Sequence, residues 1–126
     1  MQDLCAGVVV GVIILQTVVF APTIFTTIDA APAGKLLRAL FPKFFRLLMI
    51  MGALTLVALW FDEEASVAQY VMAGLTVLLP LTCALLVPAT NRATDEGAKQ
   101  RFKMLHTISV LLTLAVLGAN IAIPFL

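Results

Sequence analysis

The stretch Asn91–Ser109, NRATDEGAKQRFKMLHTIS, decides how this chain is built. It carries four of the eight basic residues and the only histidine, and it separates two apolar runs, LTCALLVPAT before it and VLLTLAVLGANIAIPFL from Val110 onwards. A short charged segment between two long apolar runs is typical of a loop that joins two membrane helices. The stretch therefore indicates both the solvent of the chain and its direction through the membrane.

The composition argues against a water-soluble domain. The chain has 126 residues, of which 62% are hydrophobic and 12% are charged, and its mean hydropathy is +1.09. A small soluble domain cannot bury so many apolar side chains, because its surface is large relative to its interior. In lipid, a helix of about 20 apolar residues crosses the hydrocarbon and pairs its own backbone groups. We therefore predict an all-α integral membrane protein.

Four apolar runs predict a four-helix bundle that forms a single transmembrane domain over residues 1–126. The expected helices cover approximately residues 4–28, 43–61, 65–90 and 99–125. Pro42 stands at a favourable first-turn position for the second helix. Before it, Gly34–Phe41 set leucines against Lys35 and Arg38. This pattern predicts a short amphipathic segment in the membrane interface before the second helix.

The first run contains three features that bear on helix packing. Gly7 and Gly11 have the small-xxx-small spacing that lets membrane helices approach closely, either inside the bundle or between two copies of the chain. Gln16 lies near mid-depth, where its amide needs a hydrogen-bond partner on a neighbouring helix. Pro22 predicts a bend, because proline removes one helical hydrogen bond.

The third run contains two prolines, and the first and third runs contain one cysteine each. Pro80 predicts a kink, and Pro88 predicts a helix end or a second bend. Cys5 lies at the outer tip of the first run, and Cys83 lies in the inner half of the third. Their opposite depths exclude a disulfide, because bridged Cα atoms lie within about 7 Å of each other.

The basic residues orient the chain. All eight Lys and Arg residues lie in two segments, one before the second run and one before the fourth. The turn between the second and third runs carries Asp62, Glu63 and Glu64 and no cation. Basic loops stay in the cytoplasm, so we predict that both termini and the acidic turn lie outside it. The expected location is the inner (plasma) membrane of a bacterial-type cell.

Polar side chains gather where the predicted helices reach the cytoplasmic side. The candidate binding residues are Asp29, Arg46, Asn91, His106 and Ser109. Ionisable groups in membrane segments are costly and often functional, which makes a cytoplasm-facing polar cluster around His106 one hypothesis. The alternative is an interfacial histidine that bonds to a loop, and the shallow depth of His106 favours this alternative because depth decides the cost of burial.

The sequence offers little for catalysis or for metal binding. It has one histidine, no CxxC pair, no Ser-His-Asp set, no phosphate loop and no nucleic-acid patch. Cys83, Met49, Met51 and His106 share the inner half, which would suit a soft copper(I) ion, but packing explains the methionines better. We therefore predict no catalytic residue, no metal site, no cofactor and no nucleic-acid partner.

Three motifs stand out along the chain, namely LFPKFF (Leu40–Phe45), NRATDE (Asn91–Glu96) and RFKMLHTIS (Arg101–Ser109). Together they resemble the TMEM205-like, or DUF4149, family of small four-helix membrane proteins. The matching positions are Phe41, Pro42, Phe45, Asn91, Asp95, Phe102, Leu105, His106 and Ser109. After Ser109 the chain has Val110–Leu112 where the family pattern has an asparagine, so a polar role further along that helix is not implied. The resemblance implies the fold and the membrane location, and it transfers no reaction.

Three classes of function remain. A non-enzymatic accessory or scaffold subunit, or a homo-oligomer, fits the lack of soluble domains and of catalytic groups. A small-solute or ion permease would have to act as an oligomer, because four helices leave little room for a lined path. A haem or redox membrane protein is the third class, by analogy with the small protoporphyrinogen oxidase family. The expected partners are the lipid bilayer and either further copies of the chain or a larger membrane complex.

Overall fold

The computed structural model describes residues 1–126 and is entirely helical. Its elements are α1 (Gln2–Ile14), the π-helical η1 (Leu15–Phe20), α2 (Ala21–Thr27), α3 (Ala30–Trp60), α4 (Val67–Asp95), α5 (Lys99–Ala122) and the 3₁₀ turn η2 (Ile123–Phe125). Four helical spans, with α1, η1 and α2 forming the first, are long and apolar enough to cross a membrane. The all-α, four-helix membrane architecture is thus confirmed.

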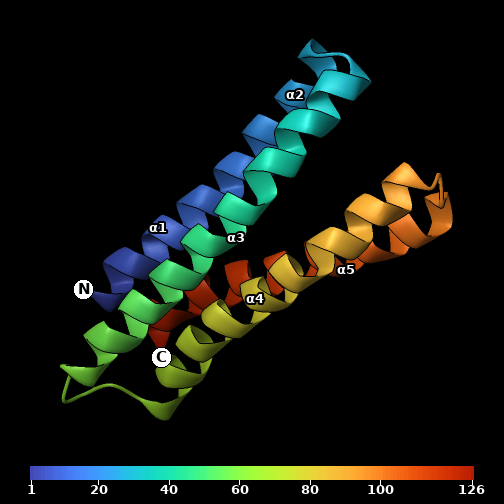
Figure 1. Ribbon diagram of the computed structural model, residues 1–126. Helices are drawn as coiled ribbons and strands as arrows, with labels where there is room; N and C mark the ends of the chain where they lie inside the picture. Colours follow the sequence, from blue (N-terminus) through green and yellow to red (C-terminus); the bar gives the residue numbers. More distant parts are fainter.

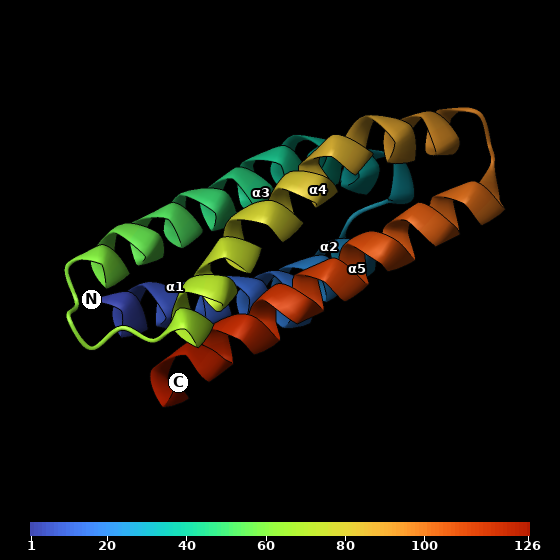
Figure 2. The same cartoon turned by 90° about the horizontal axis from the view of Figure 1, so that it is seen from below.

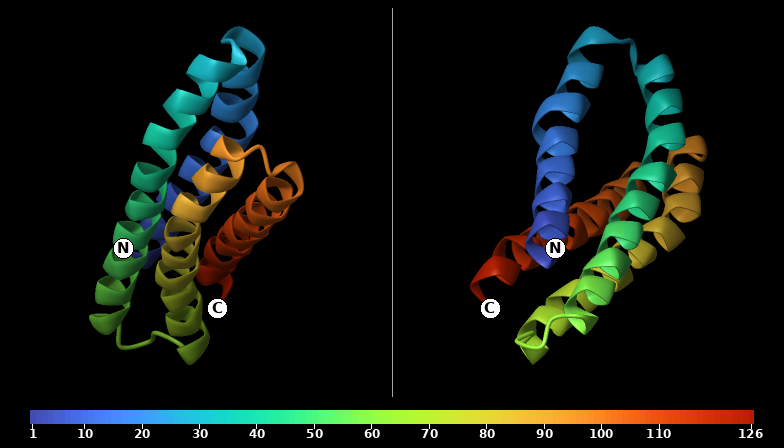
Figure 3. Two further views of the ribbon diagram at one scale, coloured as in Figure 1. Left: turned by 45° about the vertical axis from the view of Figure 1, so that its right-hand side comes forward. Right: turned by 90° about the vertical axis from the view of Figure 1, so that its left-hand side faces the viewer.

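The four spans alternate in direction, as Figures 1 and 2 show. Both termini and the turn between α3 and α4 lie at one end of the bundle, which we call the terminal end. The opposite end, which we call the basic end, holds the α2–α3 and α4–α5 connections, and these lie apart from each other (Figures 1 and 3). α3 packs on α4, α4 packs on α5, and α1 packs on both α3 and α5.

The buried core joins all four spans near the middle of the bundle. It consists of Val9, Ile13, Phe44, Phe45, Leu48, Cys83 and Val116. Other large apolar side chains point outwards, among them Val57, Leu85 and Leu111. Outward apolar side chains are what a lipid solvent requires. Cys5 and Cys83 are both free thiols, which confirms the expectation of no disulfide.

Two helices continue through prolines at which the sequence pattern predicts boundaries. Gly34–Phe41 do not form a separate segment: α3 begins at Ala30 and passes through Pro42 without a break. α4 passes through both Pro80 and Pro88 and ends at Asp95, so the helix end expected near Thr90 is wrong. Proline is tolerated inside membrane helices, because neighbouring helices and hydroxyl side chains can satisfy the freed backbone groups.

Helix one responds to Pro22 in a different way. The six residues before α2 form a π-helical turn, in which the Ala21 N–H donates to the Gln16 carbonyl. Pro22 has no N–H to donate, and its ring crowds the carbonyl four residues earlier. Widening the preceding turn relieves that crowding. The predicted bend at Pro22 is therefore a change of helix type between Leu15 and Phe20.

Glycine shapes one helix contact, and it is not the contact that the glycine motif suggests. A Cβ atom added to Gly52 would lie 2.9 Å from the Thr76 carbonyl carbon and 2.9 Å from Val77 Cγ2. The backbone of α3 therefore approaches both the backbone and the side chains of α4 at this point. Gly7 and Gly11 have no atom within 4 Å of an added Cβ, so packing inside the bundle does not use them. Their role between two copies stays a prediction.

Candidate functional site

The five predicted binding residues are not joined to one another by any side-chain hydrogen bond. Asp29 is the exposed residue before the first turn of α3, and its carboxylate makes no capping bond. Arg46 is exposed on α3 and belongs to neither ion pair of the chain. His106 is exposed on α5, where its ring stacks on Phe102 with 5.7 Å between centroids and 6° between planes.

Asn91 and Ser109 take part in contacts between helices only through their carbonyls. Arg38 donates to the Asn91 carbonyl over 3.4 Å. The Ser109 carbonyl accepts from the Cys83 thiol over 3.7 Å and from the Thr113 hydroxyl over 2.8 Å. The structure therefore spreads the five residues over three helices and a loop, and their role as one binding site stays a prediction.

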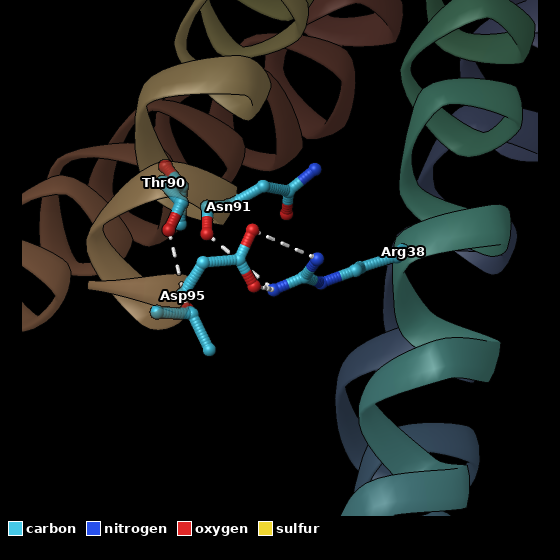
Figure 4. Close-up of polar contacts among 5 residues, drawn as sticks. Arg38, Thr90, Asn91 and Asp95 are labelled. Carbon is cyan, nitrogen blue, oxygen red and sulfur yellow. Dashed lines mark hydrogen bonds and ion pairs between the residues drawn. The ribbon is translucent and has the colours of Figure 1, made fainter. Parts of the chain in front are cut away.

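An ion pair joins α3 to α4 near the basic end (Figure 4). Arg38 Nη2 lies 2.5 Å from Asp95 Oδ1, and both side chains are exposed. Asp95 is the last residue of α4. An exposed ion pair contributes at most about 1 kcal/mol. The pair therefore bridges α3 and the end of α4 but adds little stability.

The terminal end carries several side-chain hydrogen bonds between elements. They are Gln2 to the Asp62 carboxylate (2.6 Å), Gln69 to the Ile123 carbonyl (3.1 Å) and Tyr70 to the Leu59 carbonyl (2.8 Å). These bonds connect α1 to the acidic turn, α4 to η2, and α4 to α3. Side-chain hydrogen bonds thus connect the elements at the end of the bundle where both termini lie.

A buried amide adds a further bond inside the bundle. Asn120 is 1% exposed, and its Nδ2 donates to Thr76 Oγ1 over 2.8 Å and to the Val116 carbonyl over 2.9 Å. Its Oδ1 has no hydrogen-bond partner. A polar bond between helices in an apolar environment fixes their register. The sequence shows Asn120 as a polar residue near the end of the fourth apolar run, but it carries no signal that identifies Thr76 as its partner.

The half of helix one towards the basic end differs from the half towards the terminal end. α1 buries Cys5, Ala6, Val9 and Ile13, whereas η1 buries only Gln16 and α2 buries no residue at all. Apart from η1, its neighbour in the chain, α3 is the only element that α2 packs against. No hydrogen bond connects a side chain of residues 15–28 to another helix. The half of helix one that follows Ile14 is therefore weakly held by the rest of the bundle.

Gln16 lies where helix one passes from its packed half to its unpacked half. Its side chain is 5% exposed, and Nε2 has no acceptor. The prediction that Gln16 bonds to a neighbouring helix is therefore wrong. A buried donor without a partner costs about 1–3 kcal/mol. π-helical turns such as the one that begins at Leu15 are frequent at functional sites, so this transition is the strongest candidate for a functional element.

Comparison with known proteins identifies a family. The family model of DUF4149, a domain of unknown function, matches residues 4–99. The match covers helix one, α3 and α4, and it ends before the Phe102–Ser109 motif of α5. No curated protein and no solved structure matches the chain. Since the match extends over most of the sequence, the chain belongs to the DUF4149 family.

Proposed function

We propose that the protein is a non-enzymatic scaffold or accessory subunit of the inner membrane, and that it assembles with a second copy of itself through helix one. One observation carries this proposal: the bundle leaves the segment from Leu15 to Thr27 almost without buried side chains. A helix that crosses the membrane beside three others would bury one face along its whole length if the bundle were complete in itself. An assembly partner would cover this segment.

The outward side of helix one favours a second copy as that partner. Gly7 and Gly11 are exposed, and no atom of the bundle approaches an added Cβ at either position. Val18, further along the helix, is 65% exposed. Two glycines four residues apart allow two identical membrane helices to meet closely, and a twofold interface presents the same surface from both subunits.

The orientation belongs to the same proposal. The basic end lies in the cytoplasm, and both termini lie outside, because Lys and Arg are retained on the inner side. α3 has 31 residues, which at 1.5 Å per residue is about 46 Å and exceeds the hydrocarbon thickness of roughly 30 Å. The first turns of α3, including Gly34–Phe41, therefore extend into the inner interface.

The buried hydroxyl groups support packing over transport. Thr55 donates to the Met51 carbonyl, Thr76 to the Met72 carbonyl and Thr113 to the Ser109 carbonyl, over 2.8–2.9 Å. A permeation path would be lined by polar groups that can bind the solute. Because each of these hydroxyls donates within its own helix, the bundle of one chain supports assembly better than permeation.

Cysteine cross-linking in membranes tests the assembly. In a background with Cys5→Ala and Cys83→Ala, we expect Val18→Cys to give a disulfide-linked dimer on mild oxidation. Leu85→Cys is the matched control, because Leu85 is 71% exposed and lies at a similar depth on α4. Equal dimer yields from the two variants at low expression would refute the interface. Gly11→Ile should abolish the Val18→Cys dimer while the protein still accumulates.

Labelling from one side of the membrane tests the orientation. In the same background, Glu63→Cys should react with an impermeant maleimide in intact spheroplasts. Lys99→Cys should react only after lysis. The opposite pattern would overturn the proposed sidedness and leave the cross-linking result standing.

A further inference from the structure

Three of the four cations of α3 make no ion pair. Arg38 binds Asp95, whereas Lys35, Lys43 and Arg46 are exposed and have no hydrogen-bond or ion-pair partner in the chain. At 100° per residue these three side chains lie within about 80° of one another around the helix axis. The exposed residues Ile50 and Val57 continue the same side of the helix. The side is thus apolar towards the terminal end and cationic towards the basic end.

Arg46 lies deeper than an interfacial cation would. About four turns of helix, or roughly 21 Å, separate it from Trp60 at the terminal end of α3. Trp60 is 79% exposed, and tryptophan marks the membrane boundary. With about 30 Å of hydrocarbon, the Arg46 Cα lies roughly 9 Å inside the opposite boundary. Its guanidinium must therefore extend back towards the headgroups.

The geometry points to a binding site for the phosphate of an anionic phospholipid, formed by Arg46 and Lys43 on the lipid-facing side of α3. The Arg46 side chain extends from the hydrocarbon region to the level of the headgroups. There its planar guanidinium can bind two phosphate oxygens. Lys43, one turn closer to the basic end, adds a second positive charge. The apolar side chain of Ile50 packs against the acyl chain of the same lipid.

Lipid phosphate is the ligand that the position favours. A guanidinium inside the hydrocarbon boundary without an anion is costly, and the chain supplies no carboxylate to Arg46. At that depth the phosphates of the inner leaflet are the nearest anions. The inference goes beyond the proposed assembly, since it requires a membrane-embedded α3 but no second copy.

Native mass spectrometry of the purified protein tests the site. The wild-type protein, delipidated in mild detergent, is titrated with phosphatidylglycerol or with phosphatidylcholine of the same acyl chains. We expect one phosphatidylglycerol to bind in preference to phosphatidylcholine. Each cation near a headgroup contributes about 5-fold in affinity, so K43Q/R46Q should bind phosphatidylglycerol roughly 30-fold more weakly.

The matched control is K99Q/K103Q, which removes two exposed cations from the same end of the bundle. It should bind phosphatidylglycerol like the wild-type protein. Equal losses in both double variants would show that net charge governs binding and would overturn the site. Arg46→Lys keeps the charge and should lose only part of the preference, which separates binding from a folding defect. Displacement of the lipid by millimolar inorganic phosphate would also refute a lipid site.

Discussion

The replacement Gly52→Ala tests the closest contact between two helices. The added Cβ would lie 2.9 Å from the Thr76 carbonyl carbon, 2.9 Å from Val77 Cγ2 and 3.1 Å from Thr76 Cβ. Real Cβ atoms essentially never approach other heavy atoms so closely. Val77 could change its rotamer, but the carbonyl carbon belongs to the backbone of α4. α3 and α4 would therefore have to separate locally.

The magnitude follows from two opposing effects. Overpacking a well-filled contact costs typically about 1–3 kcal/mol, and a backbone obstacle places Gly52→Ala in the upper half of that range. Replacing glycine by alanine inside a helix stabilises the folded protein by about 0.5–1 kcal/mol. We therefore expect a net loss of about 1–2.5 kcal/mol in the free energy of unfolding. The separation should also weaken the nearby bond between Asn120 and Thr76.

The assay is unfolding of the purified protein by SDS in mixed micelles, followed by circular dichroism. Gly74→Ala is the control, because no atom lies within 4 Å of its added Cβ, and it should leave the stability unchanged or slightly raised. Combining Gly52→Ala with Val77→Ala should restore only part of the loss. Wild-type stability of Gly52→Ala would refute the contact, and full restoration by Val77→Ala would show that a side chain, not the backbone, limits the approach.

Three further variants address the polar residues. Asn120→Leu should cost about 0.5–2 kcal/mol in the same assay, because it removes one bond between helices while Thr76 keeps its bond to its own helix. His106→Ala should accumulate and unfold like the wild-type protein, within about 0.5 kcal/mol, since the ring is exposed; poor accumulation that His106→Gln restores would contradict this. A double-mutant cycle with Arg38→Gln and Asp95→Asn should give a coupling below about 1 kcal/mol that falls with added salt.

The sequence predicts the architecture well because the signal for a membrane helix is long and additive. Each apolar run extends over a whole span, so a few misjudged residues do not change the number of helices. The helix boundaries are harder to predict, since they depend on single prolines. Pro42 and Pro88 look like a start and an end by the rules for soluble helices, yet both lie inside continuous helices of this structure.

Contacts between helices could not be predicted, because they depend on the register of one helix against another. The spacing of Gly7 and Gly11 shows that a close approach is possible but not which surface makes it. Gly52 makes the close approach to α4 without any small-xxx-small motif. Asn120 was recognisable as a polar residue in a membrane helix, but its partner Thr76 precedes it by 44 residues and becomes visible only when α4 and α5 are placed side by side.

The distribution of bonds between helices explains why the bundle separates towards its basic end. Bonds from Gln2, Gln69, Tyr70 and Asn120 hold α1, α3, α4 and α5 together in the half that contains the termini. In the other half the Arg38 side chain alone bridges α3 and α4. No side-chain hydrogen bond joins residues 15–28 to another helix. A region with few buried contacts can rearrange at low free-energy cost. A partner that binds helix one after Ile14 would therefore not have to displace existing contacts, which supports the assembly that we propose for this segment.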